Sequence, residues 1–302
     1  MNHLRLLSYV DAVARVGSIR QAAEQLHVAA SAVNRRIQDI EEELGTPIFE
    51  RMPRGMRLTT AGELFIKYIR DRSSDLDQVR SQIEELKGLR RGTVRIVSSQ
   101  ALAPSFLPRF ISRFRESHPL VAFKVTVGDH LQALKMLRNF ETDLALVFNL
   151  SDEPDITRIC ELEQRLMCLM HKTHPLAKKQ VGLRLRDCID FPIVLPDLDL
   201  GGRQLLDRFL LRSSIKLKPM IESNSFEFLR GCLQYDQALT FQIAIGAVTD
   251  SSEVVARHIV DRGFPSGRLV LANLRSRQLP LIASAFSEAF INSTSESTIA
   301  SV

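Results

Sequence analysis

Residues 18–57 constrain the fold of this chain more than any other stretch. Two short amphipathic patterns lie back to back here, with apolar residues at 3- and 4-residue spacing and no proline or glycine between Ile19 and Leu44. Such spacing predicts two short helices, and residues 27–30 suffice only for a tight turn between them. The arrangement is typical of a helix-turn-helix, whose second helix can lie in the DNA major groove. An ordinary helical hairpin within a core fits the same pattern.

The outward face of the second helix carries small or hydrogen-bonding side chains, as base reading requires. Asn34 and Arg35 are the candidate base contacts. Ser31 and Gln38 are candidates for phosphate contacts, whereas Arg36 faces nearer the protein or the DNA backbone.

A basic turn with proline and glycine at its tip follows this helix. We expect a short hairpin, or wing, in which Arg51, Arg54 and Arg57 meet phosphates. Residues 1–60 contain 8 Lys and Arg against 7 Asp and Glu, a net charge of +1. Net charge therefore does not support DNA binding, and the prediction depends on where the arginines lie. Solvated surface charge is the alternative for each of them.

A long charged helix is predicted over residues 60–86, with Thr60 as N-cap and Glu63 three residues on. One apolar seam at heptad spacing comprises Phe65, Ile69, Leu76, Val79, Ile83 and Leu86. A single helix cannot bury such a seam, so a second copy of it is the simplest partner, and packing on its own N-terminal domain is the alternative. A dimer would hold two recognition helices at the separation that a two-fold symmetric operator demands.

Strands and helices alternate after a glycine-punctuated hinge at residues 87–92. Their order over residues 94–148 predicts a parallel sheet. One strand is expected over residues 156–170 and a frayed polar tail over 293–302. The elements are too many for one small sheet, and a polar break at 151–155 falls at the midpoint. We expect two α/β lobes with a ligand cleft between them.

The cleft candidates lie where predicted strands end and helices begin. They are Ser98, Ser99, Gln100, Asp129, Phe148, Gly202 and Arg203. Helix N-termini favour anions, and Arg203 can form a bidentate hydrogen bond with a carboxylate. An organic acid is therefore the expected effector. Plain N-capping by the serines and a surface salt bridge for Arg203 are the alternatives.

Other functional classes leave little trace in the sequence. No signal peptide and no apolar run of roughly 18 residues is present, so a cytoplasmic protein is expected, with no membrane partner. The four cysteines lack CxxC spacing and are expected to be reduced and buried, with a redox pair of Cys160 and Cys168 as the alternative. His171 and His174 lack the partners of a metal site, and no nucleotide-binding or catalytic motif occurs. We expect no metal, no cofactor and no enzymatic activity.

The chain resembles the LysR-type transcriptional regulators over nearly its whole length. The resemblance is carried by Gly17-Ser18 and by residues 22–28 (AAEQLHV), 32–37 (AVNRRI), 41–45 (EEELG), 47–51 (PIFER), 57–59 (RLT) and 61–62 (AG). It implies a winged helix-turn-helix, a dimerising linker helix, a two-lobed effector domain like that of periplasmic binding proteins, and usually a tetramer. Ala29 and Ala30 depart from the Ser and Gln that the family often has there, so an amide able to pair with adenine is missing. Tyr235-Asp236-Gln237-Ala238 replaces a glycine-rich turn often found in the second lobe.

These observations predict an α/β protein with an N-terminal all-α winged helix-turn-helix. The expected division is residues 1–59 for DNA binding, 60–90 for the linker helix and hinge, and 91–302 for the effector domain. Lobe I would cover about 91–160 and 268–292, and lobe II about 161–267. The expected function is regulation of transcription by a homodimer or homotetramer on an interrupted inverted repeat of double-stranded DNA, with RNA polymerase as a further partner. A ligand-independent DNA-binding protein and an α/β enzyme with a fused DNA-binding module are the alternatives.

Overall fold

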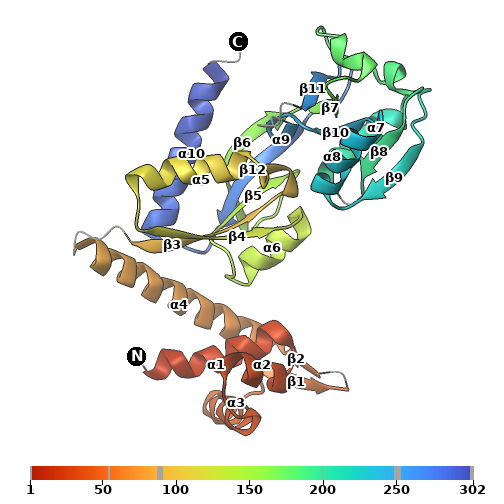
Figure 1. The fold of residues 1–302 in the computed structure, drawn as a ribbon. Coiled ribbons are helices and arrows are strands. Elements are labelled where there is room, and N and C mark those ends of the chain that lie inside the picture. Colours follow the sequence, from red (N-terminus) through yellow and green to blue (C-terminus); the bar gives the residue numbers. More distant parts are fainter. Residues whose placement is uncertain (1, 54, 87–90, 199, 248–252, 300–302) are drawn as a thin grey trace. The chain divides into compact units, whose positions relative to one another are not determined.

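The computed structural model describes residues 2–53, 55–86, 91–198, 200–247 and 253–299. The chain forms two compact units. Unit 1 comprises Met1–Leu86 and Ser276–Pro280, and unit 2 comprises Lys87–Arg275 and Leu281–Val302. Each unit has its own apolar core and is described by itself (Figure 1).

Unit 1 begins with the three predicted helices, α1 (Asn2–Val16), α2 (Ile19–Leu26) and α3 (Ala30–Leu44). Ser18 caps α2 by accepting a hydrogen bond from the Gln21 amide at 3.4 Å. His27 ends α2 in the left-handed region, with a φ of 53°, which turns the chain sharply into α3. The fully buried core residues include Val10, Val13, Ala22, Val33 and Ile37, which are the apolar faces that the sequence spacing predicts.

The predicted wing is an antiparallel hairpin of β1 (Phe49–Met52) and β2 (Gly55–Leu58). Gly17 holds the hairpin against the helices, because its carbonyl accepts from the Met56 amide at 2.8 Å. Gly55 lies so close to the same carbonyl, with a φ of 128°, that a Cβ atom would collide with it. Arg54 lies outside the described residues.

The long helix α4 (Thr60–Leu86) has the predicted bounds, but its cap differs from the predicted one. Its first turn is capped by Thr59, whose hydroxyl accepts from the Gly62 amide at 2.9 Å, so the predicted capping box of Thr60 and Glu63 is wrong. The register differs because Gly62 must meet the Ile48 carbonyl, an approach that no residue with a Cβ atom allows. The sequence pattern shows the Thr–Glu pair but not this tertiary contact.

Some apolar residues of α4 are buried in its first half, and others are exposed in its second half. Ile66 and Ile69 are buried in the core of unit 1, so the first half of the helix packs on its own domain. Val79 and Ile83 farther along are 47% and 45% exposed. The side chain of Leu86 and the hinge residues 87–90 lie outside the described part of the chain.

The first lobe of unit 2 is a five-stranded sheet in the order β4-β3-β5-β12-β6. The strands β3 (Gly92–Ser98), β4 (Val121–Val127) and β5 (Leu144–Phe148) are parallel, as predicted. Strand β12 (Gly267–Leu274) pairs antiparallel with both β5 and β6 (Ile156–Gln164), so β6 runs in the same direction as the first three strands. Helix α6 (His130–Arg138) covers one face, and α5 (Phe106–Ser117) and α10 (Leu281–Ile299) cover the other (Figure 1). The predicted frayed tail at 293–302 is wrong for its first residues, which continue α10 to Ile299.

The second lobe contains two small sheets. The antiparallel sheet has the order β10-β7-β11, with β7 (Leu166–His171), β10 (Thr240–Ile243) and β11 (Val254–His258). The parallel pair is β8 (Ile193–Pro196) with β9 (Pro219–Ser223), and helices α7 (Gly201–Leu210), α8 (Phe226–Tyr235) and α9 (Ala244–Ala247) complete the lobe. The single strand predicted over 156–170 is wrong, because β6 and β7 pair in different sheets and Arg165 separates them.

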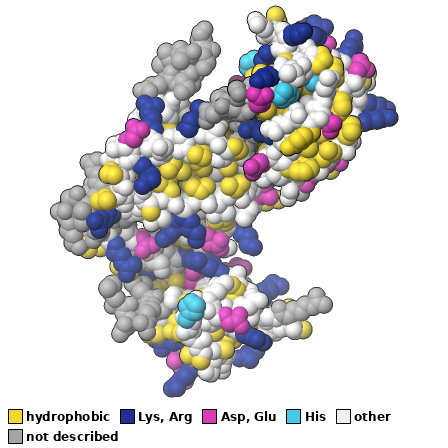
Figure 2. Space-filling view, in the orientation of Figure 1, with side chains coloured by type: hydrophobic (Ala, Val, Ile, Leu, Met, Phe, Trp, Pro, Cys, Tyr) yellow, Lys and Arg dark blue, Asp and Glu magenta, His cyan; other side chains and the backbone are white. Residues whose placement is uncertain are grey.

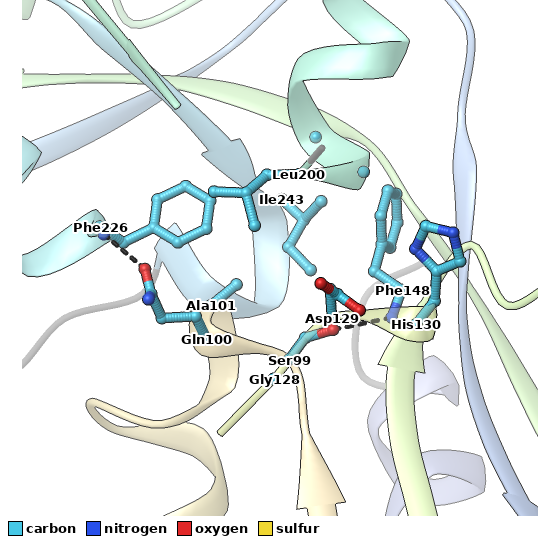
Figure 3. Close-up of a pocket in the computed structure, with 12 residues that line it drawn as sticks. Ser99, Gln100, Ala101, Gly128, Asp129, His130, Phe148, Leu200, Phe226 and Ile243 are labelled. Carbon is cyan, nitrogen blue, oxygen red and sulfur yellow. Dashed lines mark hydrogen bonds between the residues drawn. The ribbon is translucent and has the colours of Figure 1, made fainter. Parts of the chain in front are cut away.

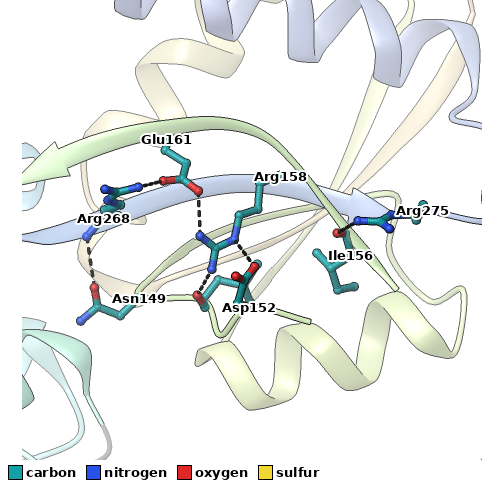
Figure 4. A network of polar contacts seen from close by, with 8 residues as sticks. Asn149, Asp152, Ile156, Arg158, Glu161, Arg268 and Arg275 are labelled. Atoms are coloured by element: carbon teal, nitrogen blue, oxygen red, sulfur yellow. Dashed lines mark hydrogen bonds and ion pairs between the residues drawn. The ribbon is translucent and has the colours of Figure 1, made fainter. Parts of the chain in front are cut away.

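Arginine–carboxylate contacts tie together the strands that lead from one lobe to the other (Figure 4). Arg158 on β6 contacts Glu161 at 2.8 Å and donates to the Leu150 carbonyl at 2.9 Å. Arg268 on β12 pairs with the same Glu161. Hydrogen bonds from Arg268 and Arg158 hold the pKa of Glu161 below its ordinary value. The carboxylate therefore stays ionised and keeps β6 and β12 in register.

Candidate functional site

The start of α3 presents open hydrogen-bond donors as well as exposed side chains. Ala29 is its N-cap and offers no side-chain acceptor to the first turn. Ser31, Arg35 and Gln38 are exposed, while Val33 lies on the opposite, buried face. Free N–H groups and the positive end of the helix dipole favour an anion such as a phosphate. Ala29 therefore leaves the helix terminus without a side-chain cap, and the missing amide is that of the next residue, Ala30.

Asn34 is linked to the wing rather than free. Its Oδ1 atom accepts from Arg51 Nη2 on β1 at 3.1 Å, and Asn34 is half-buried. This contact between α3 and the hairpin joins two predicted DNA-contact residues that are 17 positions apart. Arg57 on β2 is exposed and lies opposite Glu50 in the hairpin register.

Arg36 lies on another face of α3. Its guanidinium contacts Asp39 at 3.4 Å and lines a groove with Leu7, Ile40 and Phe65. Arg35 and Arg36 are about 100° apart around the helix, so one points outward and the other faces α1 and α4. Arg36 therefore faces the protein, which is one of the two orientations expected for it, and its contact with DNA stays a prediction.

Unit 2 has a cavity of about 30 Å³ between its lobes (Figure 3). Five of the predicted cleft residues line it, namely Ser99, Gln100, Asp129, Phe148 and Gly202. Sequence reasoning missed Ala101, Gly128, His130, Leu200, Gly201, Phe226 and Ile243. Several of these are apolar residues at the ends of elements, and nothing in their local pattern distinguishes them from core residues.

The two serines at the end of β3 differ. Ser99 lines the cavity, and its Oγ atom accepts from the Phe148 amide at 2.9 Å, so its own proton is available to another acceptor. Ser98 is fully buried, contacts the Ser99 carbonyl at 3.3 Å and does not line the cavity. The prediction for Ser98 is therefore wrong. It belongs to the strand, and the chain opens toward the cleft only one residue later.

Phe148 fills the space between the lobes. It is 6% exposed, and its ring lies against the backbones of Gly201 on α7 and Gly267 on β12. A Cβ atom on Gly201 would be 2.6 Å from the ring, and one on Gly267 would also collide with it. Both glycines therefore provide space for a side chain of the first lobe in the core of the second.

Gln100 connects the lobes through a hydrogen bond. Its Oε1 atom accepts from the amide of Phe226, the first residue of α8, at 2.6 Å. The next residue, Ala101, brings its carbonyl to the backbone of Gly246 on α9. These contacts hold the lobes together and explain why the cavity is small.

Arg203 is already occupied by groups of its own lobe. Its guanidinium contacts both oxygens of Asp207 at 3.0 and 2.9 Å, Glu222 at 2.6 Å and the Pro196 carbonyl at 2.9 Å. Burial works against its charge, but the hydrogen bonds that Arg203 donates to Glu222 and Asp207 raise its pKa above the ordinary value. The predicted role of Arg203 in holding a ligand carboxylate is wrong, since two carboxylates within the fold neutralise it and it does not line the cavity.

Comparison with known proteins assigns both parts of the chain to one family. Residues 4–63 match the domain described as "Bacterial regulatory helix-turn-helix protein, lysR family", and residues 87–294 match "LysR substrate binding domain". The chain belongs to the LysR family of transcriptional regulators. It is therefore a LysR-type regulator with an effector-binding domain, as the resemblance implied.

Relatives of this LysR-type regulator align over nearly its full length. The HTH-type transcriptional activator CmpR of Synechocystis is 25% identical, over 91% of this chain and 90% of the relative. The RuBisCO operon transcriptional regulator of Allochromatium vinosum is 26% identical, over 94% of both chains. Among solved structures, a full-length OxyR variant from Pseudomonas aeruginosa has a TM-score of 0.71 at 18% identity, covering 95% of this chain and 93% of that chain. Full-length CbnR complexed with its target DNA has a TM-score of 0.60 at 18% identity, covering 95% and 98%.

The cysteines and histidines of this LysR-type regulator do not form the groupings considered from sequence. Cys168 lies beside Cys188 in the core of the second lobe, not beside Cys160, so the Cys160–Cys168 pair is wrong. Burial raises the pKa of the Cys168 thiol well above its ordinary value. His171 does have an acidic neighbour, Glu253 at 3.2 Å, which directly precedes β11 and is 82 positions away in sequence. Within the described residues no group of three or more His, Cys, Asp and Glu side chains is arranged to hold a metal ion.

No helix in the described part of this LysR-type regulator has the length and hydropathy that crossing a membrane requires.

Proposed function

We propose that this regulator binds an interrupted inverted repeat in double-stranded DNA and is switched by a small molecule in the cleft of unit 2. The observation that carries the proposal is the cavity lined from both lobes and closed by Gln100 and Phe148. A ligand there changes the free energy of lobe closure, and it acts as an effector only if its affinity differs between the open and closed states.

The DNA-contact proposal follows from which side chains are exposed. Arg35 is the base reader, because it is exposed on α3 and forms no hydrogen bond or ion pair with the described residues. Phosphates are contacted by the open N-terminus of α3 and by Ser31, Gln38 and Arg57. Asn34 and Arg51 position the wing against α3 through their hydrogen bond, and either can also meet the DNA. Arg54 remains part of the proposal from sequence alone.

Homo-oligomerisation is supported by apolar surface that the described fold leaves exposed. Val79 and Ile83 lie one helical turn apart on α4, which fits a helix–helix contact with a second copy. Figure 2 also shows hydrophobic side chains gathered on the surface of unit 2, where Met220, Phe228 and Tyr235 are largely exposed. We propose a homodimer through α4 that associates into a homotetramer.

The remaining assignments rest on the family. We propose residues 1–59 as the DNA-binding domain, 60–90 as the linker and hinge, and 91–302 as the effector domain. A bacterial regulator of this kind works in the cytoplasm, where DNA and RNA polymerase are available as partners. We propose no enzymatic activity, because in the described residues no base contacts the Ser99 hydroxyl, whose partner is the Phe148 amide.

Genome-wide mapping of bound sites followed by mobility-shift assays tests the DNA-binding proposal. On a mapped site, Arg35→Ala is expected to weaken binding by about 1–3 kcal/mol and to relax base preference at one position. Arg36→Ala is the matched control, since it removes a neighbouring arginine that faces the groove in unit 1. Equal base preference in the wild type and Arg35→Ala would exclude Arg35 as the base reader.

The alternative of a ligand-independent DNA-binding protein predicts one footprint whatever metabolite is added. A change in footprint or in DNA bending with any cleft ligand would exclude it.

A further inference from the structure

The cavity in unit 2 has an unbalanced charge. Among the described residues that line it, Asp129 is the only Asp, Glu, Lys or Arg, and His130 contributes an imidazole. The arginine closest in sequence to the lining glycines, Arg203, is turned into its own ion pairs. The described cleft therefore holds a carboxylate without a cation to balance it.

The position of Asp129 leaves part of its carboxylate free for a ligand. It is the N-cap of α6, and its Oδ1 atom accepts from the Gln132 amide at 2.7 Å. It forms no ion pair with any described residue. Figure 3 shows the Asp129 carboxylate near the Ser99 hydroxyl, with the Phe148 ring beside them and the His130 ring next to Phe148. One hydrogen bond from a backbone amide does not neutralise the carboxylate.

Hydrogen-bond donors lie on the opposing lobe. Helix α7 starts without a side-chain cap, because its N-cap is Leu200. The backbones of Gly201 and Gly202 line the cavity at this helix terminus, where N–H groups and the dipole favour an acceptor. The rings of Phe148 and Phe226 provide apolar surface that also attracts cations.

We propose that the effector of this regulator carries an ammonium group that ion-pairs with Asp129. The proposal rests on the function proposed above, and it replaces the organic acid expected from the sequence. A ligand that is only an anion would meet the Asp129 carboxylate with no described cation to balance the two charges, so repulsion disfavours it. A zwitterion satisfies both ends, with its ammonium on Asp129 and its carboxylate at the start of α7.

The size of the cavity adds a constraint. About 30 Å³ is room for one or two water molecules, so a ligand enters only when the lobes separate or the Phe148 ring moves. Closure on the ligand then restores the contacts of Gln100 and Phe148. Small ligands with one ammonium group and a short apolar part fit this arrangement.

Ligand screening of the full chain by thermal shift and titration calorimetry tests the inference. The panel consists of primary amines, α-amino acids, amides and carboxylic acids of matched carbon skeletons. Ammonium compounds are expected to raise the Tm of the wild type, and the matched carboxylic acids are not. If amines and amino acids bind with equal affinity, the ammonium group alone is recognised. If the amino acids bind more tightly, their carboxylate makes a further contact at the start of α7.

The decisive variant is Asp129→Asn, which removes the charge and keeps an oxygen that can accept from the Gln132 amide. It is expected to weaken ammonium binding by about 10- to 100-fold, the range for a hydrogen bond to a charged group. Asp152→Asn is the matched control, because Asp152 is 95% exposed and does not line the cavity. Three results would overturn the inference: no ammonium compound binds, the matched acids bind as well as the amines, or Asp129→Asn binds amines unchanged.

Operator binding separates this inference from the proposed function. If the wild type binds its mapped DNA sites and responds to a ligand without an ammonium group, the function stands and the inference fails. If an ammonium ligand binds through Asp129 but leaves the footprint and DNA bending unchanged, the inference stands and the proposed switch fails.

Discussion

Whether a polar side chain of this protein can act on a partner depends on whether its own atoms are already occupied. Arg35 and Arg203 carry the same group, yet Arg35 projects from α3 and Arg203 is held by Asp207 and Glu222. A guanidinium has five donors in a fixed fork, so two carboxylates and a carbonyl leave Arg203 little capacity for a ligand. Occupancy of this kind is decided by residues distant in sequence.

His174 leads to a prediction about pH. Its ring is 2% exposed, lies against Phe191, and its Nδ1 atom accepts from the Leu176 amide at 3.1 Å. Burial lowers the pKa of His174 below its ordinary value of 6.5. As the pH falls through about 6.5, the unfolded chain gains a proton that the folded chain does not accept, so unfolding is favoured.

The wild type should therefore lose more of its Tm between pH 7.5 and pH 5.5 than His174→Asn does, although the variant is less stable at pH 7.5. Asparagine keeps an acceptor for the Leu176 amide but does not titrate in this range. Thermal melts at the two pH values measure the effect, and His258→Asn is the control because His258 is exposed in the same unit. An equal loss of Tm in the wild type and His174→Asn would show that His174 does not carry the pH dependence.

Among the secondary-structure elements, the wing is attached through both of its strands. The hairpin is short, and a two-stranded hairpin alone is marginally stable in water. The amide of Phe49 on β1 donates to Glu41 Oε1 on α3 at 3.1 Å. On β2, the Met56 amide donates to the Gly17 carbonyl, and Gly55 lies close to that carbonyl. The Arg51–Asn34 contact then sets the wing against α3.

Gly55→Ala should displace the wing. Alanine is strained at a φ of 128°, and its Cβ would collide with the Gly17 carbonyl, so we expect a loss of about 1–3 kcal/mol in the stability of unit 1. Gly45→Ala is the matched control, since Gly45 also has a positive φ, 65°, but no atom lies within 4 Å of its Cβ position. Urea unfolding followed by circular dichroism measures both. A Gly55→Ala protein as stable as Gly45→Ala would show that the approach to Gly17 is not constrained.

The exposed half of α4 can be tested in the same way. Lysines at Val79 and Ile83 would place charges on the surface proposed for the second copy, so sedimentation should show monomers that remain helical. Leu211→Lys is the control, because Leu211 is 87% exposed on unit 2. If the double variant dimerises with the same dissociation constant as the wild type, the dimer interface lies elsewhere.

For the whole molecule, the feature that connects ligand binding to shape is the contact between the lobes of unit 2. Gln100, Ala101 and Phe148 come from the first lobe and reach helices or the core of the second. A ligand can shift lobe closure only if the open and closed arrangements differ little in free energy. A small number of contacts between the lobes fits that requirement.

Gln100→Ala should favour the open arrangement of the lobes. It leaves the Phe226 amide at the start of α8 without its acceptor, and the net loss of one such hydrogen bond is about 1 kcal/mol. Small-angle scattering should show a larger radius of gyration, and the affinity for any cleft ligand should fall about fivefold. Gln204→Ala is the control, since Gln204 is exposed on α7. Identical scattering from the variant and the wild type would mean that Gln100 does not hold the lobes.

The elements of this protein follow from its sequence, because their causes are local. Apolar spacing predicts α1, α2 and α3, the strand–helix order predicts the parallel half of the first sheet, and Asp129 is the N-cap that its position predicts. The errors lie at boundaries, where tertiary contacts decide. The Gly62 approach to the Ile48 carbonyl moves the cap of α4 to Thr59, and separate sheets divide residues 156–170.

The availability of each functional group was decided only by the tertiary structure. Arg35 and Arg36 are neighbours in sequence, but α3 packs so that one is exposed and the other faces a groove. Ser99 and Gln100 can be predicted to lie near a ligand, yet Ser98 and Arg203 cannot be excluded without knowing their burial and partners. Residue type determines which chemistry a side chain can perform, and that much is local. Long-range packing determines whether its charge is already balanced, and here it leaves Asp129 unpaired in the cleft while it neutralises Arg203.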